Sequence, residues 1–80
     1  MKQWIAKIET VDDSMPISVR VKITIRNGSQ LNTRETIFPK KSALYSLLKE
    51  TSKPVYALLR ASRNRNAPIH FVRTVEPQSW

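Results

Sequence analysis

The sequence predicts an α+β fold, in which a small curved antiparallel sheet carries two short helices on one face, in the order β-β-β-α-α-β. Apolar and polar residues alternate over residues 17–26, Asn27-Gly28 follows them directly, and leucines recur at helical spacing beyond residue 42. Because the 80 residues contain no repeat, linker or low-complexity tract, they are expected to form one domain, residues 1–80.

The first two strands are expected over residues 4–11 and 17–26, with a loop between them that ends at Pro16. The second strand has the clearest pattern, because its apolar residues fall at every other position. These residues are Ile17, Val19, Val21, Ile23 and Ile25. β-branched residues favour strands, so one face should be buried and the other, which carries polar residues, exposed.

The return strand, residues 30–38, can pair with this strand in two registers. A two-residue turn at Asn27-Gly28 would place Arg34 beside Val21 on the apolar face. A register one residue longer would place Arg34 beside Lys22 on the polar face. It would bring Leu31, Thr33 and Ile37 to the apolar face. Because register follows the buried face, the longer register is predicted, with a three-residue turn or a bulge at Gly28.

Two helices are predicted next, over residues 42–51 and 54–63, with a single kinked helix as the alternative. Ser42 is a suitable N-cap, and each segment repeats apolar residues at i, i+3 and i+4. Pro54 is favourable in the first turn of a helix and unfavourable inside one, which favours two helices.

A turn over residues 64–68 should lead to a last strand over residues 69–75 and a short tail. This strand is expected beside the first strand, because two sheet edges would otherwise stay open.

The charge is strongly positive and uneven. Lys and Arg number 14 against 6 Asp and Glu, giving +8 and a pI near 10.5. Residues 1–13 contain two cations and three acidic residues, a net of −1, and residues 14–80 carry a net of +9. A basic domain of this kind is typical of nucleic-acid binding, and an acidic protein partner is the alternative.

The main candidate site is the polar face of residues 17–26. Arg20, Lys22 and Arg26 project from it in steps of about 6.6 Å per two residues, close to the spacing of about 7 Å between phosphates. Arg34 joins them in the preferred register. A half-exposed strand needs polar outer residues, but this requirement does not explain why all three charges have one sign.

Two further basic groups are candidates. Arg60, Arg63 and Arg65 lie near the end of the second predicted helix, where they would stabilise the helix dipole or contact phosphates. Lys40 and Lys41 precede Ser42 at a helix N-terminus, where backbone N–H groups suit a bound phosphate, although a solvated lysine pair is the simpler interpretation.

Catalysis has little support. The chain has no cysteine, no metal-ligand cluster and no Gly-rich phosphate loop, so no metal, cofactor or small-molecule substrate is expected. His70 is the one histidine. With Arg60 or Arg73 it could serve a small ribonuclease, but a partly buried structural histidine is the preferred interpretation.

The sequence therefore predicts a non-enzymatic nucleic-acid-binding protein, with DNA slightly favoured over RNA. The alternatives are a regulator or inhibitor that docks on an acidic host protein, and a small ribonuclease or toxin. A cytoplasmic location is expected, since cysteine is absent and no segment suits a signal peptide or membrane span. The thin core of so short a chain leaves a homodimer as an option.

Overall fold

The structure is a computed structural model that describes residues 2–51, 54–63, 65 and 69–80. These described residues form one helix and an antiparallel sheet of five strands in the order β3-β2-β1-β4-β5. The elements are β1 (Gln3–Asp12), β2 (Ser18–Asn27), β3 (Gln30–Pro39), α1 (Ala43–Glu50), β4 (Val55–Ala61) and β5 (Ile69–Thr74). The predicted α+β class is confirmed, but the predicted order of elements is wrong.

The β2–β3 hairpin adopts neither of the two registers considered from the sequence. Asn27 pairs with Gln30 around a two-residue turn that begins at Gly28, whose φ of 64° favours glycine. Arg34 consequently lies opposite Ile23 on the inner face of the sheet, and the predicted pairing of Arg34 with Lys22 is wrong.

The burial of Phe38, near the end of β3, accounts for this register. The register places the buried Phe38 opposite Val19, and leaves Leu31 and Ile37 53% and 57% exposed on the outer face. The inner face beside the turn is not covered by the helix, so Arg34 can occupy it while remaining exposed.

The second predicted helix is a strand, β4. Val55, Ala57 and Leu59 are buried while Tyr56 and Leu58 are half-buried, so burial alternates with the period of a strand. Because both faces of β4 carry apolar side chains, the sequence satisfies helical spacing as well, and pairing with β1 and β5 decides between the two.

The last strand is present as predicted but pairs with a different neighbour. β5 pairs with β4, and β4 pairs with β1, so β1 lies at the centre of the sheet and β3 and β5 form its edges. The turn predicted over residues 64–68 falls largely outside the described residues.

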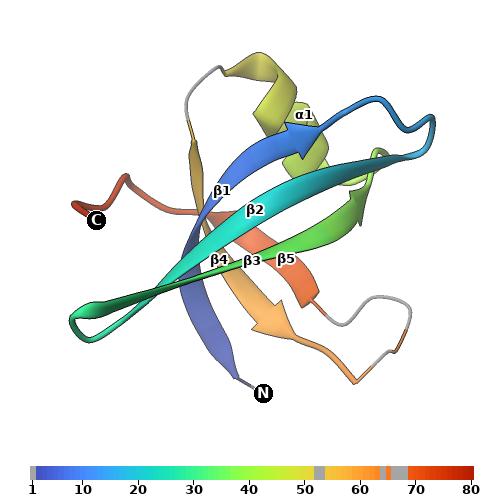
Figure 1. Cartoon of the computed structure of the whole chain (residues 1–80). Helices are drawn as coiled ribbons and strands as arrows, with labels where there is room; N and C mark the ends of the chain where they lie inside the picture. The colour runs from blue at the N-terminus through green and yellow to red at the C-terminus, as the bar shows by residue number, and fades with distance from the viewer. Residues whose placement is uncertain (1, 52–53, 64, 66–68) are drawn as a thin grey trace.

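The core lies on the inner face and is closed at one end by α1. The apolar residues of β2 from Val19 to Ile23 are fully buried there, whereas Ile17 is 77% exposed, contrary to expectation. The predicted first helix is confirmed, with the Ser42 hydroxyl accepting a hydrogen bond from the Tyr45 N–H at 3.4 Å. Leu44 is fully buried. Figure 1 shows α1 above the sheet, on the side away from the β2–β3 turn and the N-terminus.

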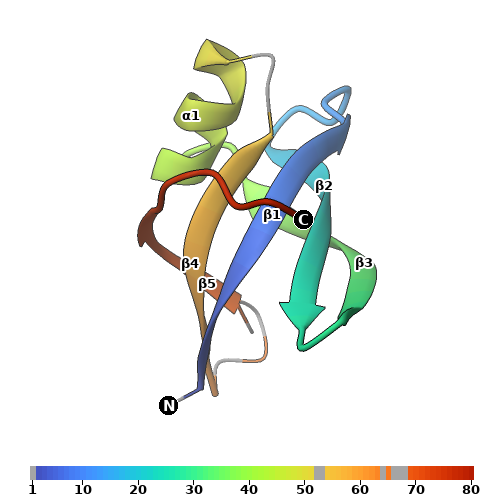
Figure 2. The ribbon, with the colours of Figure 1, turned by 90° about the vertical axis from the view of Figure 1, so that its left-hand side faces the viewer.

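The C-terminal tail returns over the outer face of the sheet. Trp80 contacts Tyr56 of β4 edge to face, with ring centroids 5.7 Å apart. In Figure 2 the tail crosses β4 and β1, so it covers part of the face opposite α1.

Candidate nucleic-acid interface

The polar face of β2, the main candidate from the sequence, is compensated by acidic side chains on both neighbouring strands. Glu9 of β1 and Glu35 of β3 both lie opposite Lys22. Lys22 is 3.9 Å from Glu9, which is also 3.9 Å from Lys7. Arg20 completes the set, at 3.6 Å from Asp12 and 3.8 Å from Glu35.

We call these six residues the charge ladder. Its members are Lys7, Arg20 and Lys22 with Glu9, Asp12 and Glu35. Three cations face three carboxylates, so the ladder carries no net charge. Opposite charges on adjacent strands stabilise sheet pairing, and this explains the like charges of Arg20 and Lys22 without an external partner.

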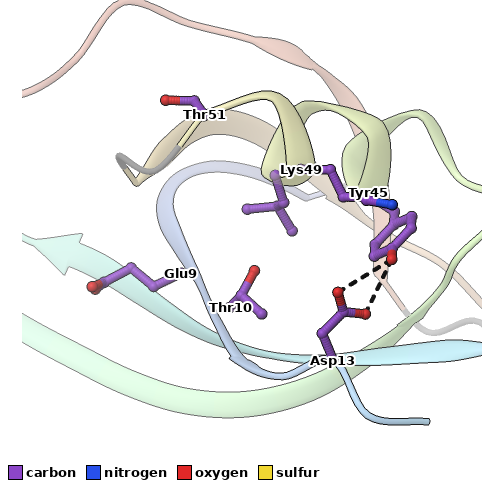
Figure 3. Close-up of a pocket in the computed structure, with 7 residues that line it drawn as sticks. Glu9, Thr10, Asp13, Tyr45, Lys49 and Thr51 are labelled. Atoms are coloured by element: carbon purple, nitrogen blue, oxygen red, sulfur yellow. Dashed lines mark hydrogen bonds between the residues drawn. The ribbon is translucent and has the colours of Figure 1, made fainter.

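A second set of paired charges joins the β1–β2 loop to α1. The Lys40 ammonium lies 2.9 Å from the Asp13 carboxylate. The same carboxylate accepts hydrogen bonds from the Tyr45 hydroxyl at 3.1 and 3.2 Å, which Figure 3 shows. The hydrogen bond from Lys40, followed by that from Tyr45, lowers the pKa of Asp13, and the same bond to Asp13 raises the pKa of Lys40. Lys40 therefore connects the turn before α1 with the β1–β2 loop, while Lys41 is exposed.

Asp12 is also engaged within this loop. Its carboxylate accepts the Ser14 hydroxyl at 2.6 Å and the Ser14 N–H at 2.9 Å, and these bonds, with a smaller contribution from Arg20, lower the pKa of Asp12. The hollow of about 320 Å³ between β1 and α1 contains Asp13, Glu9 and one lysine, Lys49 (Figure 3). The α1 end of the molecule is thus a region of mixed charge.

The opposite end of the sheet is different. The start of β1, the β2–β3 turn and the end of β4 meet there because the strands are antiparallel (Figures 1 and 2). We call this the basic end. Its cations are Lys2, Arg26, Arg34, Arg60, Arg63 and Arg65, all exposed.

The basic end lacks acidic partners. All six acidic residues of the chain lie elsewhere, namely in the second half of β1 and the loop after it, in the middle of β3, at the end of α1 and in the C-terminal tail. Within the described part of the chain, no ion pair involves any of the six cations. Of these six cations, only Arg26 has a side-chain hydrogen bond within the described part of the chain, which its Nε donates to the Gly28 carbonyl at 2.9 Å.

A hollow of about 440 Å³ opens at the basic end. Trp4, Ile25 and Ala61 supply its apolar surface. Its polar lining consists of Lys2, Arg26, Asn27, Asn32 and Arg34. Trp4 is half-buried, and its indole Nε1 is buried without a hydrogen-bond partner. An unsatisfied buried donor of this kind costs about 1–3 kcal/mol.

The structure separates the residues predicted from the sequence into two groups and one remaining residue. The basic end contains Arg26, Arg34, Arg60, Arg63 and Arg65, whereas Arg20, Lys22 and Lys40 have acidic partners. Lys41 belongs to neither group and is exposed in the turn before α1. His70 lies opposite Arg60 in the β4–β5 pair and is half-buried.

Of the residues that line the hollow, only Arg26 and Arg34 were selected as site residues from the sequence, and Lys2, Trp4 and Asn32 are among those that were missed. Lys2 and Trp4 are two residues apart and therefore lie on the same side of the chain at the start of β1. The alternation of Trp4, Ala6 and Ile8 could have placed this side on the inner face of the sheet. Asn32 could not have been found this way, because its place beside Ile25 depends on the hairpin register.

Among the described residues, no group of three or more His, Asp or Glu side chains is arranged to hold a metal ion. No helix in that part of the chain is long and apolar enough to cross a membrane. Comparison with protein-family models, curated proteins and solved structures found no significant match.

Proposed function

We propose that this protein binds nucleic acid without enzymatic activity, and that the basic end contacts the phosphates. The observation that carries the proposal is the concentration of six cations at one end of the sheet, where the described chain offers them no acidic partner. Affinity for nucleic acid arises largely from Lys and Arg that replace counterions along the phosphate backbone.

The contrast with the rest of the surface supports this location. Among the described residues, four cations are in ion pairs with carboxylates, namely Lys7, Arg20, Lys22 and Lys40. Those pairs must be disrupted before the cations can neutralise phosphate. Unpaired cations repel one another in the free protein, and a polyanion removes that repulsion on binding.

The proposal changes the residues expected to bind. Arg26, Arg34, Arg60, Arg63 and Arg65 remain candidates from the sequence, with Lys2 added, and Arg20, Lys22 and Lys40 become structural. A cytoplasmic location, proposed from the sequence, suits such a role.

The test compares two double variants with the same loss of charge. Arg34→Ser/Arg60→Ser alters the basic end, and Arg20→Ser/Lys22→Ser alters the charge ladder. Binding to fluorescent DNA and RNA, single-stranded and duplex, is measured by anisotropy at several salt concentrations. The basic-end variant should reduce the slope of log K against log salt by about 1.4–1.8, which corresponds to two lost phosphate contacts. The ladder variant should keep the wild-type slope.

Circular dichroism of both variants checks that they remain folded. Absence of salt-dependent binding by the wild type to any nucleic acid would overturn the proposal. An equal loss in both variants would overturn the assignment to the basic end. A partner that survives nuclease treatment of a cell extract and is released by the basic-end variant would instead support an acidic protein ligand.

A further inference from the structure

The hollow at the basic end has a mixed composition that a phosphate contact alone does not require. Trp4 and Ile25 line it with apolar surface, while Lys2, Arg26 and Arg34 supply positive charge. A site for phosphates needs only the cations. An apolar surface beside them suits a ligand that combines a flat aromatic group with an anion.

We infer that this hollow receives an unpaired nucleobase, so that the ligand of the basic end is single-stranded nucleic acid. The inference rests on the proposed function and specifies its ligand. The base would contact the Trp4 indole, and the flanking phosphates would lie against Lys2, Arg26 and Arg34. Bases in a duplex are stacked and paired and cannot present a face to an indole, whereas unpaired bases can.

The polar groups of the hollow suit the edge of a base. Asn27 and Asn32 carry amide groups that both donate and accept hydrogen bonds. The volume of about 440 Å³ falls within the range of about 300–1,000 Å³ that is usual for ligand sites.

The position of the hollow agrees with such a ligand. The residues that line it belong to the start of β1, the two sides of the β2–β3 turn and the end of β4. These segments lie at the end of the sheet away from α1 (Figure 2). A strand that lays one base into the hollow can continue past Arg63 and Arg65, which follow the end of β4.

The experiment uses Trp4 itself as the reporter. Trp80→Phe keeps an aromatic ring against Tyr56 and leaves Trp4 as the one tryptophan, since the chain has two. This variant is titrated with a single-stranded decamer of thymidine, the matching decamer of uridine, and a ten-base-pair duplex. Binding of a single strand should quench the Trp4 emission and exceed duplex binding about tenfold or more, as expected for a stacked base.

Two substitutions of Trp4 then separate stacking from charge. Trp4→Leu should lower single-strand affinity about tenfold or more, and Trp4→Phe, which keeps a ring, should recover part of it. Both should retain the wild-type affinity for duplex and the salt slope, because the cations are unchanged. Thermal melting establishes that each variant is folded.

The outcomes distinguish this inference from the proposal on which it rests. Salt-dependent binding with equal affinity for single strand and duplex, and with unchanged Trp4 emission, overturns the base site and leaves the phosphate contact standing. No binding to any of the three probes overturns both. Quenching by one decamer alone supports the inference and shows whether the site takes DNA or RNA.

Discussion

The two ends of the sheet use charge in opposite ways. At the α1 end, Asp13 binds Lys40 and Tyr45, and the nearby charge ladder pairs three cations with three carboxylates. At the basic end, the described chain supplies six cations and no carboxylate to match them. One end therefore satisfies its charges internally and is closed by a helix, whereas the other leaves its charges and part of its apolar surface open.

This difference shows why net charge alone does not locate a binding surface. The +8 of the chain is compatible with a cationic face anywhere on the molecule. On the strand face that looked most cationic, Arg20 and Lys22 are neutralised by carboxylates of the neighbouring strands, and Arg26 alone keeps an unpaired charge within the described chain. The surface that remains positive is assembled from chain segments that are distant in sequence.

The largest expected effect concerns packing at the two ends. Leu44→Ala removes a fully buried side chain of α1 and should lower the free energy of unfolding by about 2–5 kcal/mol, because the cavity cannot fully collapse. Leu31→Ala, at an exposed position next to the β2–β3 turn, should change it by less than about 0.5 kcal/mol. Urea denaturation measures both. Similar losses would mean that the two ends contribute equally to the core.

A smaller effect should appear in acid. Because hydrogen bonds lower the pKa of folded Asp13 below 3.8, its contribution to stability is present above that pH and is lost as the pH falls through the folded pKa. The midpoint of thermal unfolding should therefore fall less steeply below about pH 4 in Asp13→Asn than in wild type. Part of the acid dependence of the unfolding midpoint should remain in both proteins, because the pKa of Asp12 is also lowered. Identical acid profiles would show that the Asp13 contacts do not stabilise the fold.

The smallest effect should distinguish the charges of the two ends. Arg34→Thr removes a cation from a region of like charge, so without nucleic acid it should leave stability within about 0.5 kcal/mol or raise it slightly at low salt. Lys40→Ala removes the partner of Asp13 and should lower stability under the same conditions. Melting temperatures at low and high salt measure both. A clear loss in Arg34→Thr would indicate a structural role for that side chain.

Several features could be read from local sequence. The alternation of apolar residues identified β2, and the position of Ser42 before a leucine-rich stretch identified α1. β1, β3 and β5 were also found within a residue or two at each end. These features depend on neighbours along the chain, which is why periodicity and capping detect them.

The register of the hairpin and the identity of β4 depended on contacts between distant segments. Arg34 lies on the inner face because Phe38 is buried opposite Val19, and residues 55–61 form a strand because β1 and β5 pair with both their edges. The acidic neighbours of Lys22 likewise come from two other strands. Composition and periodicity established a basic α+β protein with a capped helix. Strand pairing decided which of its cations are neutralised, because cross-strand partners are set by burial and register rather than by distance along the chain.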